Sequence, residues 1–161
     1  MSQTALTRRQ ALLAASGVLA APALVQAQPR AIKLGIIQPV TGALAQDGEY
    51  GRLGAELAIA DINAGGGIKA LGGAPIEMVF GDARSTPDGG VAEVEKMQAE
   101  GVLAIVGGFA SPICLAASQA ASRYDLPYIV DVGVSDQIVT RGLTNTFRFG
   151  PGFGTVTATA L

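Results

Sequence analysis

The 161-residue chain contains no histidine and a single cysteine, Cys114. Without histidine, neither a Ser-His-Asp nor a Cys-His catalytic site can be built from this chain alone. Zinc sites that depend on histidine and several cysteines are excluded for the same reason. One cysteine also allows no disulfide within the chain, a bond that exported proteins can otherwise use. An enzyme is therefore an unfavoured interpretation.

Clustered positive charge is also missing. The chain has 11 lysine and arginine residues against 13 aspartate and glutamate residues, a formal net charge of −2. Nucleic acids are bound by clustered basic side chains, so no nucleic acid partner is expected. The glycines after the first apolar segment do not form the dinucleotide pattern G-x-G-x-x-G. The segment Gly108–Ser111 is not a G-x-S-x-G nucleophile turn. The sequence predicts no cofactor and no metal.

The N-terminal segment has the organisation of an export signal. Two adjacent arginines, Arg8 and Arg9, precede a mostly apolar run over residues 11–24. This run is shorter than the roughly 20 residues that span a bilayer. Val25 and Ala27 are suited to cleavage after Ala27. The pattern predicts a signal peptide over residues 1–27, export by the twin-arginine machinery and a periplasmic location. An amphipathic helix is the weaker alternative, because the segment has no acid and little polar periodicity.

After the signal segment, short apolar runs alternate with helical patterns. Strands are predicted over Ile32–Ile37, Ile76–Phe80, Val102–Val106, Pro127–Val130 and Thr146–Phe149. Helical spacing of Tyr50, Leu53, Leu57, Ala60 and Ile62 predicts a first helix that ends near Asn63. A second is predicted from the Ser85–Asp88 start signal to Gly101, a third from Ser111 to Tyr124, and the first turns of a fourth over residues 155–161.

This alternation predicts an α/β fold with a doubly wound parallel sheet that helices cover on both faces. The unbroken apolar run Val102–Val106 is expected to be a strand buried on both faces. No internal repeat, low-complexity tract or linker between domains is evident in the sequence.

Ligands of open parallel sheets bind at the carboxyl ends of the strands. Three predicted loops lie there: Gln38–Gly42 with Asp47 beyond it, Gly107–Pro112, and Asp131–Ser135. In the second loop, Ser111 is expected to be the N-cap of the third helix and Pro112 its first helical residue. A helix start offers N–H groups to a carboxylate, and the Ser111 hydroxyl could add a further hydrogen bond. The alternative is that Ser111 only caps its helix.

Two carboxylates, Asp82 and Asp131, lie near predicted strand ends. Each is interpreted as a solvated or capping group rather than a general acid or base, because such residues are rarely buried without a partner. Cys114 falls inside the third predicted helix, where a buried and unreactive thiol is the expectation.

Several segments carry a resemblance to a known family. They are Ile32–Gly35 with Pro39–Gly42, Gly54–Ile68, Ile105–Gly108 with Ser111, and Thr140–Gly142 with Phe147–Arg148. In this order they resemble the leucine/isoleucine/valine-binding proteins, which are type I periplasmic solute-binding proteins of ABC importers. The resemblance covers nearly all of residues 31–154. It implies two α/β lobes, joined by a hinge, that close over a small solute and deliver it to permease subunits in the membrane. Residues 28–161 would then form an incomplete first lobe.

The resemblance also implies which residues contact the solute. By position, Ala110, Ser111 and Pro112 hold its carboxylate or equivalent head group, and the loop Val132–Val134 makes a second set of contacts. Amino-acid binders of the family place a hydroxyl where Val134 stands, so a different polar or acidic solute, such as an amide, is as plausible as an amino acid. The candidate ligand-binding residues are Asp47, Ala110, Ser111, Pro112, Val132, Gly133 and Val134.

Two other interpretations stay open. One is a ligand-binding sensor domain of the same fold, which would report its ligand to a regulator or receptor. A cleavable export signal favours the free binding protein instead. The other is a truncated product without function, because residues 155–161 have the pattern of a helix that has only begun.

Overall fold

The computed structural model describes residues 29–159. The predicted signal peptide over residues 1–27 lies outside the described residues. The elements, in chain order, are β1 (Ile32–Gln38), α2 (Ala45–Ala64), the 3₁₀-helix η1 (Lys69–Leu71), β2 (Ile76–Asp82), α3 (Pro87–Glu100), β3 (Ala104–Gly107), α4 (Ser111–Ser122), β4 (Tyr128–Val130), α5 (Gln137–Thr140), β5 (Thr146–Arg148) and α6 (Phe153–Thr159). Within this range, no helix combines the length and apolarity needed to span a membrane.

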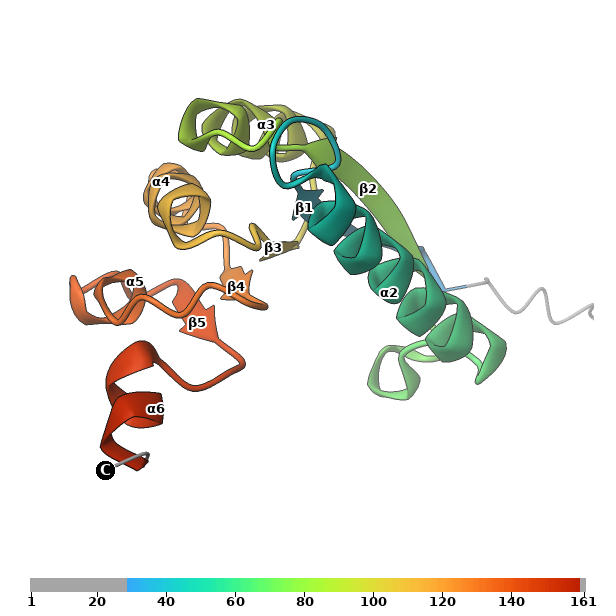
Figure 1. Cartoon of the computed structure of the whole chain (residues 1–161). Coiled ribbons are helices and arrows are strands. Elements are labelled where there is room, and N and C mark those ends of the chain that lie inside the picture. Colours follow the sequence, from blue (N-terminus) through green and yellow to red (C-terminus); the bar gives the residue numbers. More distant parts are fainter. Residues whose placement is uncertain (1–28, 160–161) are drawn as a thin grey trace, which may run out of the picture.

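The five strands form one parallel sheet in the order β2-β1-β3-β4-β5 (Figure 1). Helices α3 and α4 pack together on one face of it, and α2 lies on the other. Alternation along β1 shows the two faces, because successive side chains of a strand point to opposite sides. Ile37 belongs to the buried cluster that contains Met97 of α3, whereas the next residue, Gln38, contacts Gly51 of α2. The predicted α/β fold with a parallel sheet is confirmed.

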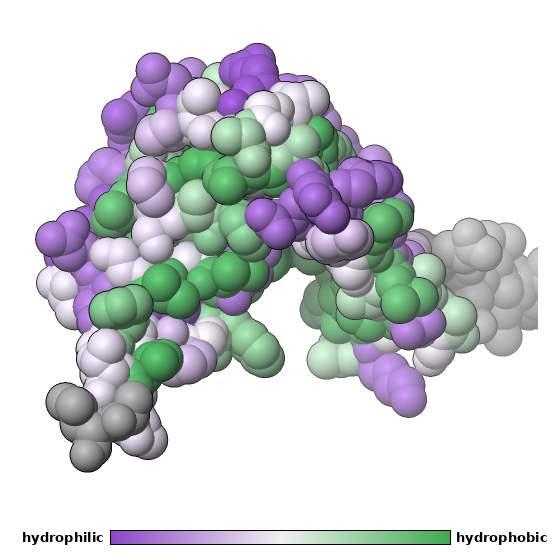
Figure 2. All heavy atoms as spheres, in the orientation of Figure 1, coloured by the Kyte–Doolittle hydropathy of each residue, from purple (hydrophilic) through white to green (hydrophobic). Residues whose placement is uncertain are grey.

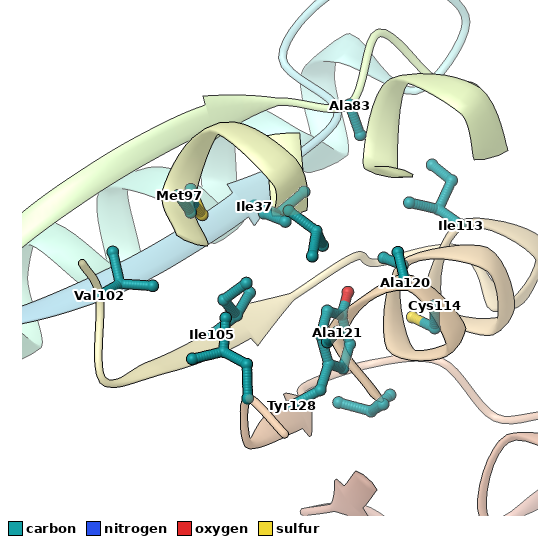
Figure 3. Close-up of a cluster of buried hydrophobic side chains, with 14 of the residues drawn as sticks. Ile37, Ala83, Met97, Val102, Ile105, Ile113, Cys114, Ala120, Ala121 and Tyr128 are labelled. Carbon is teal, nitrogen blue, oxygen red and sulfur yellow. The ribbon is translucent and has the colours of Figure 1, made fainter. Parts of the chain in front are cut away.

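The face under α3 and α4 carries the core (Figure 3). One row of paired residues crosses the whole sheet on this side, and every member is buried: Val79, Gly35, Ile105, Tyr128 and Thr146. A Cβ atom at Gly35 would lie 2.7 Å from the Met97 sulfur, so the missing side chain lets α3 approach the sheet closely. The tight packing fixes how α3 and α4 sit on the strands.

The row on the opposite face is covered unevenly. It consists of Phe80, Ile36, Val106, Ile129 and Phe147. Ile36 lies near α2 and is 3% exposed, Val106 and Ile129 are half-buried, and Phe147 is 55% exposed. On this side, α2 covers β1 and β2, and nothing within residues 29–159 covers β3 to β5. Figure 2 shows this side as a hollow with apolar side chains on its walls.

This uneven cover corrects the prediction for the third strand. The strand is Ala104–Gly107 rather than Val102–Val106, and it is buried on one face only. Ala104 and Val106 are half-buried because they point toward the uncovered side. An unbroken apolar run suits a strand between two helical layers, but the described residues supply the second layer only over β1 and β2.

The helix boundaries follow from capping groups. Thr86 caps α3 as its side chain accepts a hydrogen bond from the N–H of Gly89 at 3.0 Å. Gly101 ends α3 in a left-handed conformation with φ of +74°. Both ends agree with the predicted start signal and stop. The short helix α5, the 3₁₀-helix η1 and the start of α6 at Phe153 were not predicted.

The predicted N-cap of α4 is wrong. Ala110, in an extended conformation, is the N-cap, and Ser111 is the first helical residue. No side chain caps this helix. The backbone N–H of Cys114 bonds to the carbonyl of Ala110, which places the first helical hydrogen bond one residue earlier than predicted. The Ser111 hydroxyl is therefore available for a contact outside its own helix.

Candidate functional site

The candidate site lies at the carboxyl edge of the sheet, where three loops meet. The loop after β3 is joined to the loop after β4 by a hydrogen bond of 3.1 Å from the Ser135 N–H to the Ser111 Oγ. The end of β1 is joined to the end of β4 by a hydrogen bond of 2.5 Å from Gln38 Nε2 to Asp131 Oδ2. These ties bring together side chains that the sequence spaces by up to 93 residues.

The loop after β3 has an unusual backbone. Gly107, Gly108 and Phe109 have φ values of +129°, +103° and +51°. A Cβ atom at Gly107 would collide with the carbonyl oxygen of Ile37, so only glycine fits there. Phe109 is not a glycine, and a left-handed conformation strains it. Strain of this kind concentrates at functional loops, where the surrounding structure holds it in place. Here it turns the chain so that α4 begins at the edge of the sheet.

Ser111 presents a free donor at the start of α4. Its oxygen accepts the hydrogen bond from Ser135, so its own proton is available to an acceptor outside the protein. The first N–H groups of any helix have no partner within that helix. In α4 these belong to Ser111 and Ile113, because Pro112 has no N–H. The hydroxyl and the helix start together suit an anionic or carbonyl oxygen.

An open depression of about 480 Å³ lies beside this serine. Its lining residues are Ser111, Val134, Ser135, Asp136, Gln137 and Phe153. Of the predicted residues, the structure thus brings Ser111 and Val134 to one surface.

The other predicted residues lie around the depression or away from it. Ala110 packs against the core, and Gly133 is buried, where a Cβ atom would lie 2.8 Å from the Cys114 sulfur. Pro112 and Val132 are exposed near the same edge. Asp47 is exposed in the first turn of α2 and does not line the depression.

Arg148 holds the loop that carries Val134, a role that sequence reasoning missed. Its guanidinium donates to the carbonyl oxygens of Val134 at 3.3 Å and Ser135 at 3.0 Å, and to the Asp136 carboxylate at 3.2 Å. Asp136 in turn accepts from the Gly154 N–H, which ties α6 to the same loop. The sequence around Phe147 and Arg148 did not indicate this role of Arg148. The contacts join residues that lie 12 to 18 positions apart in the chain, so no local pattern shows them.

Asp82 organises the loop after β1. Its carboxylate accepts hydrogen bonds from the Thr41 hydroxyl at 2.6 Å and from the N–H groups of Val40 and Arg84 at 3.0 and 2.8 Å. Burial alone would raise the pKa of Asp82, but these donors outweigh it and the pKa lies below the usual value. The group is ionised at neutral pH and acts as a structural acceptor, in line with its sequence interpretation.

Cys114 is unsuited to nucleophilic chemistry. The side chain is fully buried, and burial together with the negative charge of Asp131 raises the pKa of the thiol to about 12. Thiol reactivity requires the thiolate, which is scarce at neutral pH with such a pKa. Among residues 29–159 there is also no group of three or more side chains that could hold a metal ion. Within residues 29–159, neither Cys114 nor a metal site therefore supplies a reacting group.

The periplasmic binding protein family matches residues 31–161 of the chain. The chain belongs to this family. Two curated relatives, the Leu/Ile/Val-binding protein homolog 7 of Brucella melitensis and homolog 8 of Brucella abortus, are 37% and 35% identical over 121 and 120 residues. Each match covers 74% of this chain and 29% of the relative. The chain thus spans less than a third of the length of these relatives.

Solved structures show the same fold. The branched-chain amino acid transporter substrate-binding protein LivJ from Streptococcus pneumoniae, in complex with isoleucine, is 30% identical with a TM-score of 0.70. The match covers 76% of this chain and 34% of that one. A solute-binding protein of Rhodopseudomonas palustris in complex with 3,4-dihydroxybenzoic acid is 24% identical, with a TM-score of 0.64 and coverage of 76% and 32%. The latter likeness concerns the fold alone.

These matches confirm the family and fold predictions. The chain is a homologue of type I periplasmic binding proteins and corresponds to part of a lobe. Its family comprises solute-binding proteins of ABC transporters rather than enzymes, which confirms that prediction as well. Family membership also implies an extracytoplasmic protein.

Proposed function

We propose that this chain forms part of the first lobe of a periplasmic solute-binding protein, which delivers its solute to the permease subunits of an ABC importer. The solute is a small polar molecule with a carboxylate or amide head group. One lobe of this kind covers one side of the solute, and a second lobe would cover the other. The open shape of the depression beside Ser111 supports this division, since a complete site buries most of a small ligand.

The observation that carries the proposal is the hydrogen bonding of Ser111. Its oxygen accepts from the Ser135 N–H, and its own proton is available to donate to the solute. The N–H groups at the start of α4 are donors too. A carboxylate or carbonyl oxygen is the complementary partner, and the partial positive charge of the helix start strengthens the contact with an anion.

The relatives support a carboxylate-bearing solute. The pneumococcal protein at 30% identity was solved with isoleucine, which carries a carboxylate and an apolar side chain. In this chain, Val134 and Phe153 supply apolar surface beside Ser111. The Val134 side chain cannot accept a hydrogen bond from an ammonium group, so any cationic part of the solute must find another acceptor.

A substitution at Ser111 tests the binding proposal. With isoleucine as the probe, we expect Ser111→Ala to bind roughly ten-fold more weakly than the wild type, because a hydrogen bond to a charged group is lost. Ser111→Thr keeps the hydroxyl and should retain most of the affinity. Binding is measured by NMR shift titration of the 161-residue chain, since one lobe binds weakly.

The matched control is Ser122→Ala. Ser122 lies in the last turn of the same helix, and its hydroxyl bonds to the carbonyl of Gln119 at 2.8 Å. Thermal melting is measured alongside, because Ser111→Ala also leaves the Ser135 N–H without its partner, at about 1 kcal/mol. If Ser111→Ala melts earlier but binds isoleucine as well as the wild type does, the serine is a structural tie and not a ligand contact.

The export part of the proposal depends on Arg8 and Arg9. The pair precedes a weakly apolar run, the order found in twin-arginine signals, and Ala27 would be the last residue removed. We expect Arg8→Lys with Arg9→Lys to abolish transport of a fused periplasmic reporter in cells that have the twin-arginine machinery. The unmodified signal should also fail in cells without it. Equal export in all of these cases would exclude this route.

A further inference from the structure

Asp131 is a carboxylate at the carboxyl edge without a cationic partner. It follows β4 directly and is half-buried. Its Oδ2 accepts from Gln38 Nε2 at 2.5 Å and its Oδ1 from the Val132 N–H at 2.8 Å. No lysine or arginine among residues 29–159 lies within ion-pair distance of it, whereas Asp136 on the same loop pairs with Arg148. The negative charge of Asp131 at the carboxyl edge of the sheet therefore has no positive partner within residues 29–159.

The Gln38 amide is arranged around this carboxylate. Gln38 is 2% exposed, and its N–H group faces Asp131. Its Oε1 is buried and has no hydrogen-bond partner within the described part of the chain. Rotating the amide would turn an oxygen toward the carboxylate, so Asp131 dictates the orientation and the amide oxygen stays unsatisfied. An unpaired buried acceptor is destabilising.

Two glycines keep the space for the amide. A Cβ atom at Gly51 of α2 would lie 2.8 Å from the amide carbon of Gln38. A Cβ atom at Gly107 of β3 would lie 3.3 Å from Gln38 Nε2. The side chain therefore passes over the end of β3 between two positions that lack side chains. Its reach from β1 to the end of β4 is fixed by packing on both sides.

The carboxylate belongs to the same loop as part of the site described above. Asp131 and Ser135 lie near opposite ends of the loop that follows β4, and Ser135 is bonded to Ser111. The charge of Asp131 also contributes to the raised pKa values of Cys114 and Tyr128, both of which lie beside Gly108. The negative group and the helix start of α4 thus flank the same loop, with the exposed Val132 and Val134 between them.

From this arrangement we infer that Asp131 receives a positively charged group of the solute, and that Gln38 is the positioning residue that aims the carboxylate. The inference rests on the proposed function and adds a specificity-determining residue to it. The solute then carries an anionic group for Ser111 and a cationic group for Asp131. Asp131 supplies the acceptor for the cationic group that the Val134 side chain lacks. A charged carboxylate attracts a cation more strongly than a neutral hydroxyl does.

A pair of probes that differ only in the cationic group tests the inference. Isoleucine and 3-methylpentanoate share the carboxylate and the carbon skeleton, and the second lacks the ammonium group. Each is titrated into the 161-residue chain, and the amide shifts of Ser111 and Ser135 report binding. We expect the wild type to prefer isoleucine by about ten-fold, the effect of a charged hydrogen bond. In Asp131→Asn this preference should disappear while the affinity for 3-methylpentanoate is retained.

Asp61→Asn is the matched control, because it removes the same charge. Asp61 is exposed near the end of α2, and its side chain makes no hydrogen bond or ion pair with another residue of the range 29–159. We expect the wild-type preference in this variant. Equal binding of the two probes by the wild type would overturn the inference, whatever the folding of Asp131→Asn. The inference would also be overturned if a folded Asp131→Asn variant preferred isoleucine over 3-methylpentanoate as strongly as the wild type does. If neither probe shifts Ser111 or Ser135, the proposed function fails at its own site, and the inference fails with it.

Discussion

Single residues at the carboxyl edge hold one loop to another. The Ser85 hydroxyl donates to the Thr41 carbonyl at 2.6 Å and accepts from the Leu44 N–H at 3.0 Å. Asp82 accepts from residues on both sides of the same junction. Such side chains replace the backbone partners that loops lack. These hydrogen bonds make the carboxyl edge of the sheet rigid. This edge is the surface on which we place the solute.

The lowered pKa of Asp82 predicts a pH dependence of stability. A carboxyl with a lower pKa in the folded state contributes stability that is fully present above its unfolded pKa, near 3.8. That contribution is lost as the pH falls through the folded pKa. We expect Asp82→Asn to be less stable than the wild type at pH 7 by about 1 kcal/mol, through loss of charged hydrogen bonds. The difference should shrink as the pH falls through the lowered pKa of folded Asp82.

The measurement is urea unfolding of the wild type, Asp82→Asn and Asp61→Asn between pH 7 and pH 2.5. Asp61→Asn controls for the change in net charge. A deficit in Asp82→Asn that stays constant across this range would contradict the assigned role of the Asp82 charge.

The candidate residues show where sequence reasoning reaches its limit. Ser111 could be found because a serine before a proline marks a helix start within a few residues. Its partner Ser135 lies 24 residues away, and Gln38 lies 93 residues from Asp131. No local pattern encodes such pairs, because they arise only when the strands are placed side by side in the order of the sheet.

At the scale of elements, two helices with similar start signals begin differently. Thr86-Pro87 and Ser111-Pro112 both place a hydroxyl before a proline. Thr86 is extended and caps α3, within the predicted start signal Ser85–Asp88. In α4 the left-handed Phe109 turns the chain earlier, so Ala110 is the extended residue and Ser111 is already helical. The sequence signals the presence of a helix start, and the preceding loop decides which residue is the cap.

Helix α2 shows a similar limit. Its span agrees with the spacing of Tyr50, Leu53 and Leu57, yet these side chains are 64%, 46% and 64% exposed. The residues toward the sheet include Gly48 and Gly51, where a Cβ atom would collide with Pro39 and Gln38. Apolar periodicity predicts a helix, but close approach through glycine decided which face packs inward.

At the scale of the whole molecule, the sheet has one closed face and one half-covered face. From Ile36 through Val106 and Ile129 to Phe147, the row becomes more exposed with distance from α2. Parallel sheets are normally covered on both faces, and exposed apolar patches mark interaction sites or liabilities for association. The hollow in Figure 2 lies on this side. The parallel sheet was predictable from the alternation of patterns, but the order of its strands and the extent of cover over each strand were not.

This face predicts self-association of the 161-residue chain. We expect Phe147→Ser to reduce the associated fraction, measured by sedimentation velocity at several concentrations, because it removes the most exposed member of the row. Leu71→Ser is the control, since Leu71 is 56% exposed on η1, outside the row. If both variants associate to the same extent as the wild type, the uncovered face is not the surface through which copies meet.

The most direct test of the central claim is a map of where a solute touches this lobe. Isoleucine is titrated into the uniformly ¹⁵N-labelled chain, and the amide shifts are followed residue by residue. The account predicts that the largest shifts cluster at the carboxyl edge, at Ser111, Ile113, Val134 and Ser135. Shifts that cluster at the opposite edge, around the depression lined by Asn63 and Gly67, would contradict it, as would no shift at the carboxyl edge.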